Sequence, residues 1–310
     1  MTWFRRIFRR RIQTEDQPQE GRYGGLPVAM RGGRMRAVGI PYALPRDLEE
    51  MNRLDFQHYL IRYALKHNYG APITQPLSIL DVGTGTGRWA REMAHLFPQA
   101  NVVGLDITHP PADDAAATAA GAKIIPNNYV FVAGNVLEGL PFVDGSFDFV
   151  HMRLLVAGIP HDRWPKVIQE LARVTRPGGW VESVESPSLE RGGPATQHLI
   201  EWIRQLSLRR EVHIEDGAQI APLFAPAGLV NVRTHRVDLP CGDYGGRLGR
   251  MVVTNSISGT QGVAGLFVSQ GLTTQEEFDA VLRQAQAEMR MPNNRCVLPF
   301  YIVYGQRPQW

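Results

Sequence analysis

The chain has 310 residues, 44% of them hydrophobic and 20% charged, which suits an ordinary globular protein with one large α/β domain or two small ones. The net charge of +3 is unevenly spread, because residues 1–40 carry nine arginines against three acidic residues and the remainder is mildly acidic. A basic arm on an acidic body argues against a nucleic-acid enzyme, whose basic surface would run through the fold itself.

The first thirteen residues, MTWFRRIFRRRIQ, combine apolar residues at helical spacing with arginines. This pattern fits a helix on an anionic membrane surface or a targeting segment. It also fits a short helix that packs over the domain and covers a ligand, which we favour because one such arm binds membranes only weakly. Residues 14–25 are expected to form a flexible linker, so that residues 1–40 are an arm and residues 41–310 one folded domain.

A helix is expected to begin after Asp47, whose side chain can cap it, with Glu50 as the capping-box partner. Apolar residues then recur on one face every three or four positions as far as Leu65. Residues 41–70 are therefore predicted to form a helical lid.

Short apolar runs alternate with helical segments over residues 77–186, the predicted core. Strands are expected at 77–82, 101–108, 128–136, 147–155 and 176–186, with helices at 87–97 and 161–175. This alternation predicts a parallel, doubly wound sheet. Residues 109–127 read as an Ala-rich helix or a surface loop.

The pattern changes after residue 190. A helix is expected at 196–211, strands at 229–239 and 296–306, and a helical region at 245–290. We expect the two strands to close the edge of the sheet, with the helices inserted between them.

Two cysteines, Cys241 and Cys296, stand apart without CxxC spacing. They predict neither a disulfide framework nor a zinc site and favour a reducing, cytoplasmic setting. No integral membrane segment is expected, since the uncharged residues 251–275 are interrupted by polar side chains and glycine.

The sequence ILDVGTGTGRWA, residues 79–90, reads as a strand, a glycine turn and a helix. Its glycines follow GxGxG spacing and not the GxGxxG of dinucleotide sites, which weakens a nicotinamide interpretation. No Gly-Lys-Ser/Thr follows, and Asp81 at the mouth of the turn would repel a pyrophosphate.

Polar groups end the first three predicted strands. Asp81 can meet a cationic amino group, Asp106 can accept both hydroxyls of a ribose, and Asn135 offers an amide to an adenine edge. A ligand with adenosine at one end, a zwitterion at the other and no phosphate matches this set. S-adenosylmethionine is that ligand.

These motifs resemble the class I S-adenosylmethionine-dependent methyltransferases. ILDVGTGTGRWA is similar to the first family motif, VVGLDIT to the acidic position after the second strand, GNVLEGLPFVDGSFDFVHMR to strands three and four, and ELARVTRPGGWVESVES to the approach to strand five. YALPRDLEEMNRLDFQHYLIRYAL, with the closing YIVYGQRP, resembles the LaeA-type branch of secondary metabolism. One departure is Asn135, where related sequences often carry an acidic residue.

The resemblance implies a Rossmann-like, doubly wound sheet of seven strands, parallel except for one antiparallel strand near the edge. It implies cofactor contacts from Tyr42, Arg53, Gln57, Asp81, Gly83, Thr84, Gly85, Gly87, Asp106, Ile107, Asn135, Val136, His151 and Met152. Ile107 would pack on adenine, Val136 would help hold its edge, and Arg53 would pair with the methionyl carboxylate or lie on a solvated helix face.

Methyl transfer needs an aligned acceptor and the exclusion of water, and a general base helps when the acceptor is a hydroxyl. His151, which ends the fourth strand, is the candidate base and His161 the second; a structural role for His151 stays open. The acceptor pocket is expected from the N-terminal helices and a helical insert over 241–290, whose uncharged composition suits a neutral small molecule, unless it is a plain packing helix.

The predicted function is a cytoplasmic methyltransferase that uses S-adenosylmethionine. The expected acceptor is a small molecule, a specialised metabolite. Oxygen is the expected acceptor atom, and nitrogen and carbon are alternatives. Two alternatives remain: a regulatory protein of this fold with little turnover, and a protein or nucleic-acid methyltransferase. No nucleic-acid partner is expected, because the fold itself lacks a basic face.

Overall fold

The structure is a computed structural model that describes residues 2–8, 22–23, 26–108 and 126–309. Almost all of the expected linker over 14–25 and of the Ala-rich segment over 109–127 lies outside these residues. No helix in the described parts of the chain is both long enough and apolar enough to cross a bilayer.

Seven strands form one sheet in the order β6-β5-β4-β7-β8-β10-β9. Their bounds are β4 (Ser78–Val82), β5 (Asn101–Asp106), β6 (Tyr129–Ala133), β7 (Phe147–Arg153), β8 (Thr175–Glu185), β9 (Val230–Pro240) and β10 (Val297–Gln306). The pairs from β6 to β8 are parallel, and β10 runs antiparallel to both of its neighbours, β8 and β9. The predicted seven-stranded sheet with one antiparallel strand near its edge is confirmed.

Successive side chains of a strand point to opposite faces of the sheet, and in the buried strands both sets are mostly apolar. Helices therefore cover both faces. Ile79 packs in a cluster with Trp89 of α3 (Arg88–Leu96), whereas Leu80 and Val82 pack with Leu171 of α5 (Trp164–Val174). The strand–helix alternation of the sequence therefore places α3 and α5 on opposite faces.

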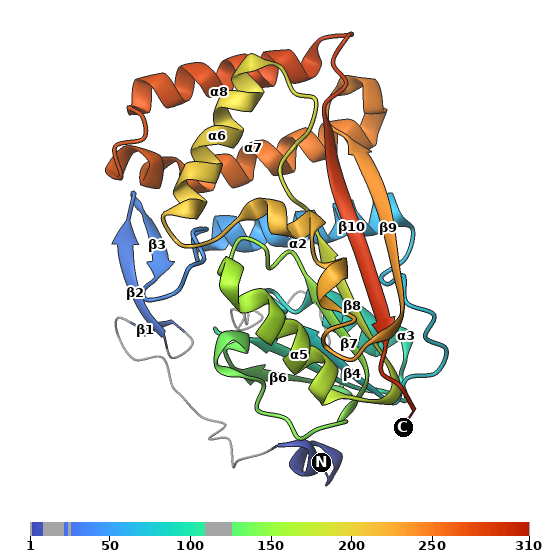
Figure 1. Cartoon of the computed structure of the whole chain (residues 1–310). Helices are drawn as coiled ribbons and strands as arrows, with labels where there is room; N and C mark the ends of the chain where they lie inside the picture. The colour runs from blue at the N-terminus through green and yellow to red at the C-terminus, as the bar shows by residue number, and fades with distance from the viewer. Residues whose placement is uncertain (1, 9–21, 24–25, 109–125, 310) are drawn as a thin grey trace.

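A helical group lies at one end of the sheet (Figure 1). It consists of α6 (Pro194–Leu208), α7 (Gly246–Ser269) and α8 (Gln275–Arg290), which share a core with α2 (Leu48–Leu65). Val263, Leu266 and Phe267 of the uncharged insert are buried in that core. Asp47 caps α2 by accepting a hydrogen bond from the backbone N–H of Glu50, as predicted.

Short 3-10 helices connect several of these elements. They are η1 (Val136–Glu138), η2 (His161–Arg163), η3 (Ile214–Ala218), η4 (Ala221–Leu223) and η5 (Asp243–Gly245). The two cysteines are buried free thiols on neighbouring strand ends, where the Cys241 N–H donates to the Cys296 carbonyl over 2.8 Å.

The helix α1 (Thr2–Ile7) packs on the core of the sheet. Ile7 is 4% exposed, Trp3 meets the edge of Phe147, and the ring of Phe8 lies 5.4 Å from that of Phe142. These contacts support the interpretation of a short helix that packs over the domain. Trp3, Ile7 and Phe8 do not line the cavity described below, so the expected covering of a ligand is not seen for them.

Residues 1–40 contain more regular structure than an arm and linker. The strands β1 (Arg22–Tyr23), β2 (Leu26–Arg31) and β3 (Arg34–Ala37) form a small antiparallel sheet. Its turn meets α7 so closely that a Cβ on Gly265 would lie 2.0 Å from the carbonyl oxygen of Gly32. Buried Arg36 donates to the Gly262 carbonyl, which adds a polar contact between this sheet and α7.

Candidate functional site

A cavity of about 310 Å³ lies between α2 and the carboxyl ends of β4, β5 and β7. In open α/β sheets ligands bind at this edge, and the volume lies at the lower end of the range for small-molecule sites. Most of the predicted cofactor residues line it: Tyr42, Arg53, Gln57, Asp81, Gly83, Thr84, Gly85, Asp106, Ile107, Asn135 and Val136. Gly87, His151 and Met152 do not.

The glycine turn between β4 and α3 has a backbone that other residues rarely adopt. Gly83 and Gly85 have φ values of +71° and +56°. A Cβ on Gly83 would also lie 2.4 Å from the side chain of Leu155, which follows β7. Glycine therefore allows both the positive φ values of the turn and the close packing of Leu155 on Gly83.

Asp106 at the end of β5 is buried and holds this turn. Its Oδ2 accepts a hydrogen bond from the N–H of Gly85 over 2.9 Å, and its Oδ1 lies 3.5 Å from a guanidinium nitrogen of Arg46. Arg46 also donates to the Thr108 hydroxyl. The carboxylate thus lies in the cavity wall with a fixed orientation.

Three ionisable residues form a row across neighbouring strands. Asp81 is in register with His151 on β7, which is in register with Glu182 on β8. Asp81 Oδ2 accepts from the Thr84 hydroxyl over 2.6 Å, and its Oδ1 lies 3.1 Å from His151 Nδ1. With a proton on Nδ1, the imidazole donates to Asp81 and fixes the carboxylate at the cavity edge.

The structure does not place His151 where a general base needs to be. Its side chain is 1% exposed and stacks on Trp89 at a ring distance of 3.8 Å. Burial lowers the pKa of His151, against the opposing effect of Asp81. Because successive side chains of β7 point to opposite faces of the sheet, His151 lies on the α3 side and Met152 packs in the core that includes α5.

The third member of the row, Glu182, is fully buried. One oxygen accepts from the N–H groups of Gly70 and Ala71, and the other lies 3.8 Å from His151 Nε2. Burial raises the pKa of Glu182 to about 7. The row therefore pairs a carboxylate at the cavity with a carboxyl group that is partly neutral near pH 7.

The two arginines near α2 differ in their partners. Arg53, the predicted partner of the methionyl carboxylate, donates two hydrogen bonds to Glu50 and a third to Asn255 of α7. Arg153 also lines the cavity and contacts His58 Nδ1 at 3.1 Å. No carboxylate among the described residues lies within 4 Å of the Arg153 guanidinium. Arg153 is not among the residues predicted from the sequence, although it directly follows His151 and Met152 at the end of β7.

At the adenine end proposed from the sequence, Asn135 caps η1. Its side-chain oxygen accepts from the Leu137 N–H over 3.0 Å, and its amide nitrogen donates to Glu138. Ile107 and Val136 add apolar surface to the same part of the lining. Asn135, which the sequence suggested as a partner of adenine, therefore also holds the start of η1.

A mostly apolar part of the lining follows β7 and forms one wall. It includes residues 154–159 and Ser186, and the cavity lining includes no residue of the predicted insert over 241–290. The insert supports the cavity from outside, because its helix α7 packs against α2, whose residues line the cavity. The reading of the insert as packing helices fits the structure better than a role in this lining.

Buried Glu185 holds that wall in place. Its two oxygens accept hydrogen bonds from the N–H groups of Leu155 and Val156, over 3.1 and 3.0 Å. Burial raises the pKa of Glu185 to about 8, against the opposing effects of these N–H groups and Arg153. The second candidate base, His161, lies outside the cavity lining and pairs with Asp216.

Comparisons with known proteins all point to methyltransferases. Residues 79–179 match a family model described as a methyltransferase domain. Methyltransferase str3 of Strobilurus tenacellus is 37% identical over 147 residues, which cover 47% of this chain and 48% of str3. Methyltransferase str2 of the same organism is 34% identical over 211 residues, which cover 66% of this chain and 72% of str2. N-methyltransferase sirN of Leptosphaeria maculans is 28% identical over 86% of this chain and 95% of its own.

A solved structure supports the same fold. Phosphoethanolamine N-methyltransferase 2 of Haemonchus contortus, in complex with S-adenosylhomocysteine, matches with a TM-score of 0.50 and 16% identity. The match covers 83% of this chain and 52% of that protein, so this chain spans about half of it.

Proposed function

This chain belongs to the S-adenosylmethionine-dependent methyltransferases, and from that premise we propose that it transfers the cofactor's methyl group to a small, largely apolar specialised metabolite. The observation that carries the proposal is that the cavity has both a polar and an apolar part. Buried carboxylates and a glycine turn form one part, and the residues after β7 form the other.

The donor set fits the cofactor. Asp106 has a carboxylate at the cavity edge for two ribose hydroxyls, and Asp81 has one for the amino group. Arg153, which has no carboxylate partner within 4 Å among the described residues, suits the methionyl carboxylate. The apolar lining from Ile107 and Val136 suits the adenine ring. This assignment replaces Arg53 with Arg153, since Glu50 and Asn255 already occupy the Arg53 guanidinium.

The chain's own contribution to the reaction is alignment and the exclusion of water. The bound cofactor supplies an electrophilic methyl group on its sulfonium, so the protein has little covalent chemistry to perform. The apolar wall over 154–159 would place the acceptor against that group and keep water out. Leu155, which lies against Gly83, joins this wall to the cofactor turn.

We propose nitrogen as the acceptor atom, in place of the oxygen favoured by the sequence. Among the described residues, no lining histidine or carboxylate is left to serve as a base: His58 contacts Glu92 and Arg153, and Asp81 and Asp106 are assigned to the cofactor. A neutral amine brings its own lone pair and needs no base before attack, whereas a hydroxyl gains from one. The N-methyltransferase name of sirN supports this choice.

The activity is tested with purified chain, isotope-labelled S-adenosylmethionine and matched pairs of small apolar amines and alcohols. We expect one labelled methyl group on an amine, detected by mass spectrometry, together with S-adenosylhomocysteine. Methylation of the alcohols alone would overturn the nitrogen assignment. Cofactor binding without turnover on either set or on metabolite extracts would favour the regulatory alternative.

Arg153→Gln tests the carboxylate assignment. We expect the affinity for S-adenosylhomocysteine to fall by about tenfold or more, since a hydrogen bond to a charged group contributes about 1.5–3 kcal/mol. The affinity for methylthioadenosine, which lacks the amino-acid part, should stay unchanged in the same calorimetric titration. An equal loss for both ligands would mean that Arg153 supports the cavity and does not contact the carboxylate.

A further inference from the structure

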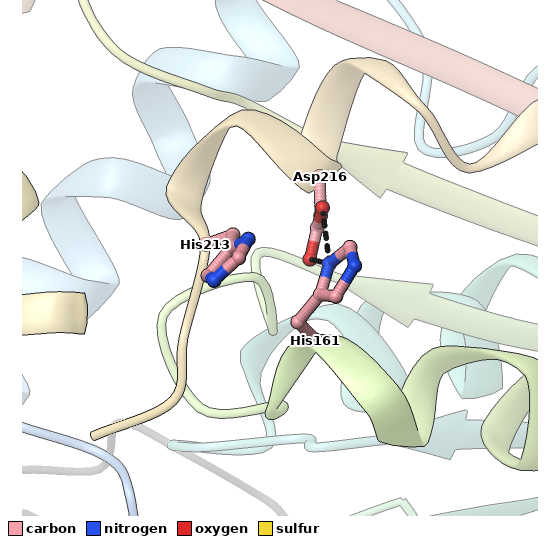
Figure 2. Close-up of side chains that lie close together, drawn as sticks. All are labelled: His161, His213 and Asp216. Atoms are coloured by element: carbon pink, nitrogen blue, oxygen red, sulfur yellow. Dashed lines mark hydrogen bonds and ion pairs between the residues drawn. The ribbon is translucent and has the colours of Figure 1, made fainter. Parts of the chain in front are cut away.

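Figure 2 shows a group of side chains with metal-ligating chemistry, His161, His213 and Asp216, none of which lines the cofactor cavity. His161 belongs to η2, His213 directly precedes η3, and Asp216 lies in η3. One potential ligand atom from each residue can be chosen so that all three lie within 4.8 Å of one another. The proposed methyl transfer uses none of these residues.

The backbone holds these three residues together although they come from distant segments. The His161 N–H donates to the Glu211 carbonyl over 2.8 Å, and the Asp216 N–H donates to the His213 carbonyl over 3.0 Å. His161 Nδ1 lies 2.9 and 3.0 Å from the two oxygens of Asp216. The cluster is therefore built before any ligand enters.

The cluster offers a free donor and access from solvent. The rings of His161 and His213 stack with centroids 4.3 Å apart, and no hydrogen bond to the His213 imidazole exists among the described residues. The side chain of His161 is 60% exposed, whereas that of Asp216 is 12% exposed. The Asp216 carboxylate is thus largely buried and held by its contact with His161, whereas both imidazoles are exposed to solvent and can turn toward an ion.

Two imidazoles and one carboxylate form a donor set that zinc and related ions prefer. Tetrahedral zinc with bonds of about 2.0–2.1 Å separates its ligand atoms by roughly 3.3 Å. His161 Nδ1 lies 2.9 and 3.0 Å from the Asp216 oxygens, and all three ligand atoms lie within 4.8 Å of one another, so an entering ion would draw the exposed imidazoles into place. We propose that His161, His213 and Asp216 bind one divalent transition-metal ion of the zinc type, with one coordination position left for water.

Such an ion would clamp the two segments that support the acceptor wall. His161 lies two residues after Ile159, which lines the cavity. The segment around η3 packs on Ser186 of the same lining, since a Cβ on Gly217 would lie 3.3 Å from the Ser186 carbonyl carbon. The proposed ion therefore stabilises the wall and takes no part in methyl transfer.

The test is a calorimetric titration of the chelator-treated full chain with zinc ions alone. We expect one ion per chain and a rise in Tm with added zinc. His213→Ala should weaken binding by at least about tenfold, the scale seen when a metal site loses a supporting group. Asp216→Asn, which keeps a hydrogen-bond acceptor for His161 but loses the charge, should weaken binding as well.

His67→Ala is the matched control, because His67 is also exposed but lies outside the cluster. It should bind zinc like the wild type, and all variants should keep their affinity for S-adenosylhomocysteine, which shows that they fold. Absence of stoichiometric binding up to about 100 µM zinc, a concentration well above a useful site's dissociation constant, would overturn the proposal. Unchanged zinc affinity in His213→Ala would also overturn it.

Discussion

Replacing Asp106 with alanine is expected to weaken the binding of S-adenosylhomocysteine by about a hundredfold or more. The proposed role of this carboxylate is to accept both ribose hydroxyls, and each charge-assisted bond contributes about 1.5–3 kcal/mol. The same carboxylate holds the N–H of Gly85 and lies beside Arg46. Its loss would therefore also release the glycine turn. Calorimetric titration of wild type and variant measures the effect.

Two further measurements make the result specific. Methylthioadenosine keeps the ribose, so Asp106→Ala should weaken it as strongly as S-adenosylhomocysteine, unlike Arg153→Gln. Asp162→Ala removes an aspartate whose side chain is 73% exposed and should leave both affinities unchanged. A folded Asp106→Ala protein that binds both ligands like the wild type would refute the assignment of the ribose site.

The fold could be predicted from the sequence because its signals are local. Mostly apolar runs such as residues 101–106 and helical faces such as that of α5 have one period each, and their alternation predicts a parallel, doubly wound sheet. The count of seven strands and the antiparallel strand came from the resemblance to a known family. The glycine turn and Asp106 follow from strand ends in the same way. These signals need no knowledge of which distant residues pack together.

What the sequence could not show depends on tertiary partners. Arg53 and Arg153 look alike in the chain, and only the contacts of Arg53 with Glu50 and Asn255 distinguish them. His151 ends a strand next to the cavity, yet the register of β7 turns it beneath Trp89. The contact of β2 and β3 with α7 depends on two glycines more than 200 residues apart. Periodicity carries none of this information.

Glu185 shows how burial can change a residue that the sequence presents as an ordinary strand carboxylate. Its pKa is raised to about 8 in the folded protein, from an ordinary value of 4.5 in the unfolded chain. Between these values the folded protein binds a proton that the unfolded chain releases. This group's contribution to stability is therefore complete below about pH 4.5 and is lost as the pH rises through about 8.

Glu185→Gln, which mimics the neutral acid, is expected to remove this dependence. Relative to the wild type, the variant's free energy of unfolding should rise between pH 5 and pH 7 by on the order of 1 kcal/mol per pH unit. Chemical denaturation across this range measures it, and the difference between the two proteins cancels the opposite contribution of buried His151. Glu276→Gln, at an exposed residue of α8, should show no such slope. A constant difference between Glu185→Gln and the wild type would mean that the carboxyl is ionised in the folded protein. The N–H groups of Leu155 and Val156 would then hold a charge at the acceptor wall.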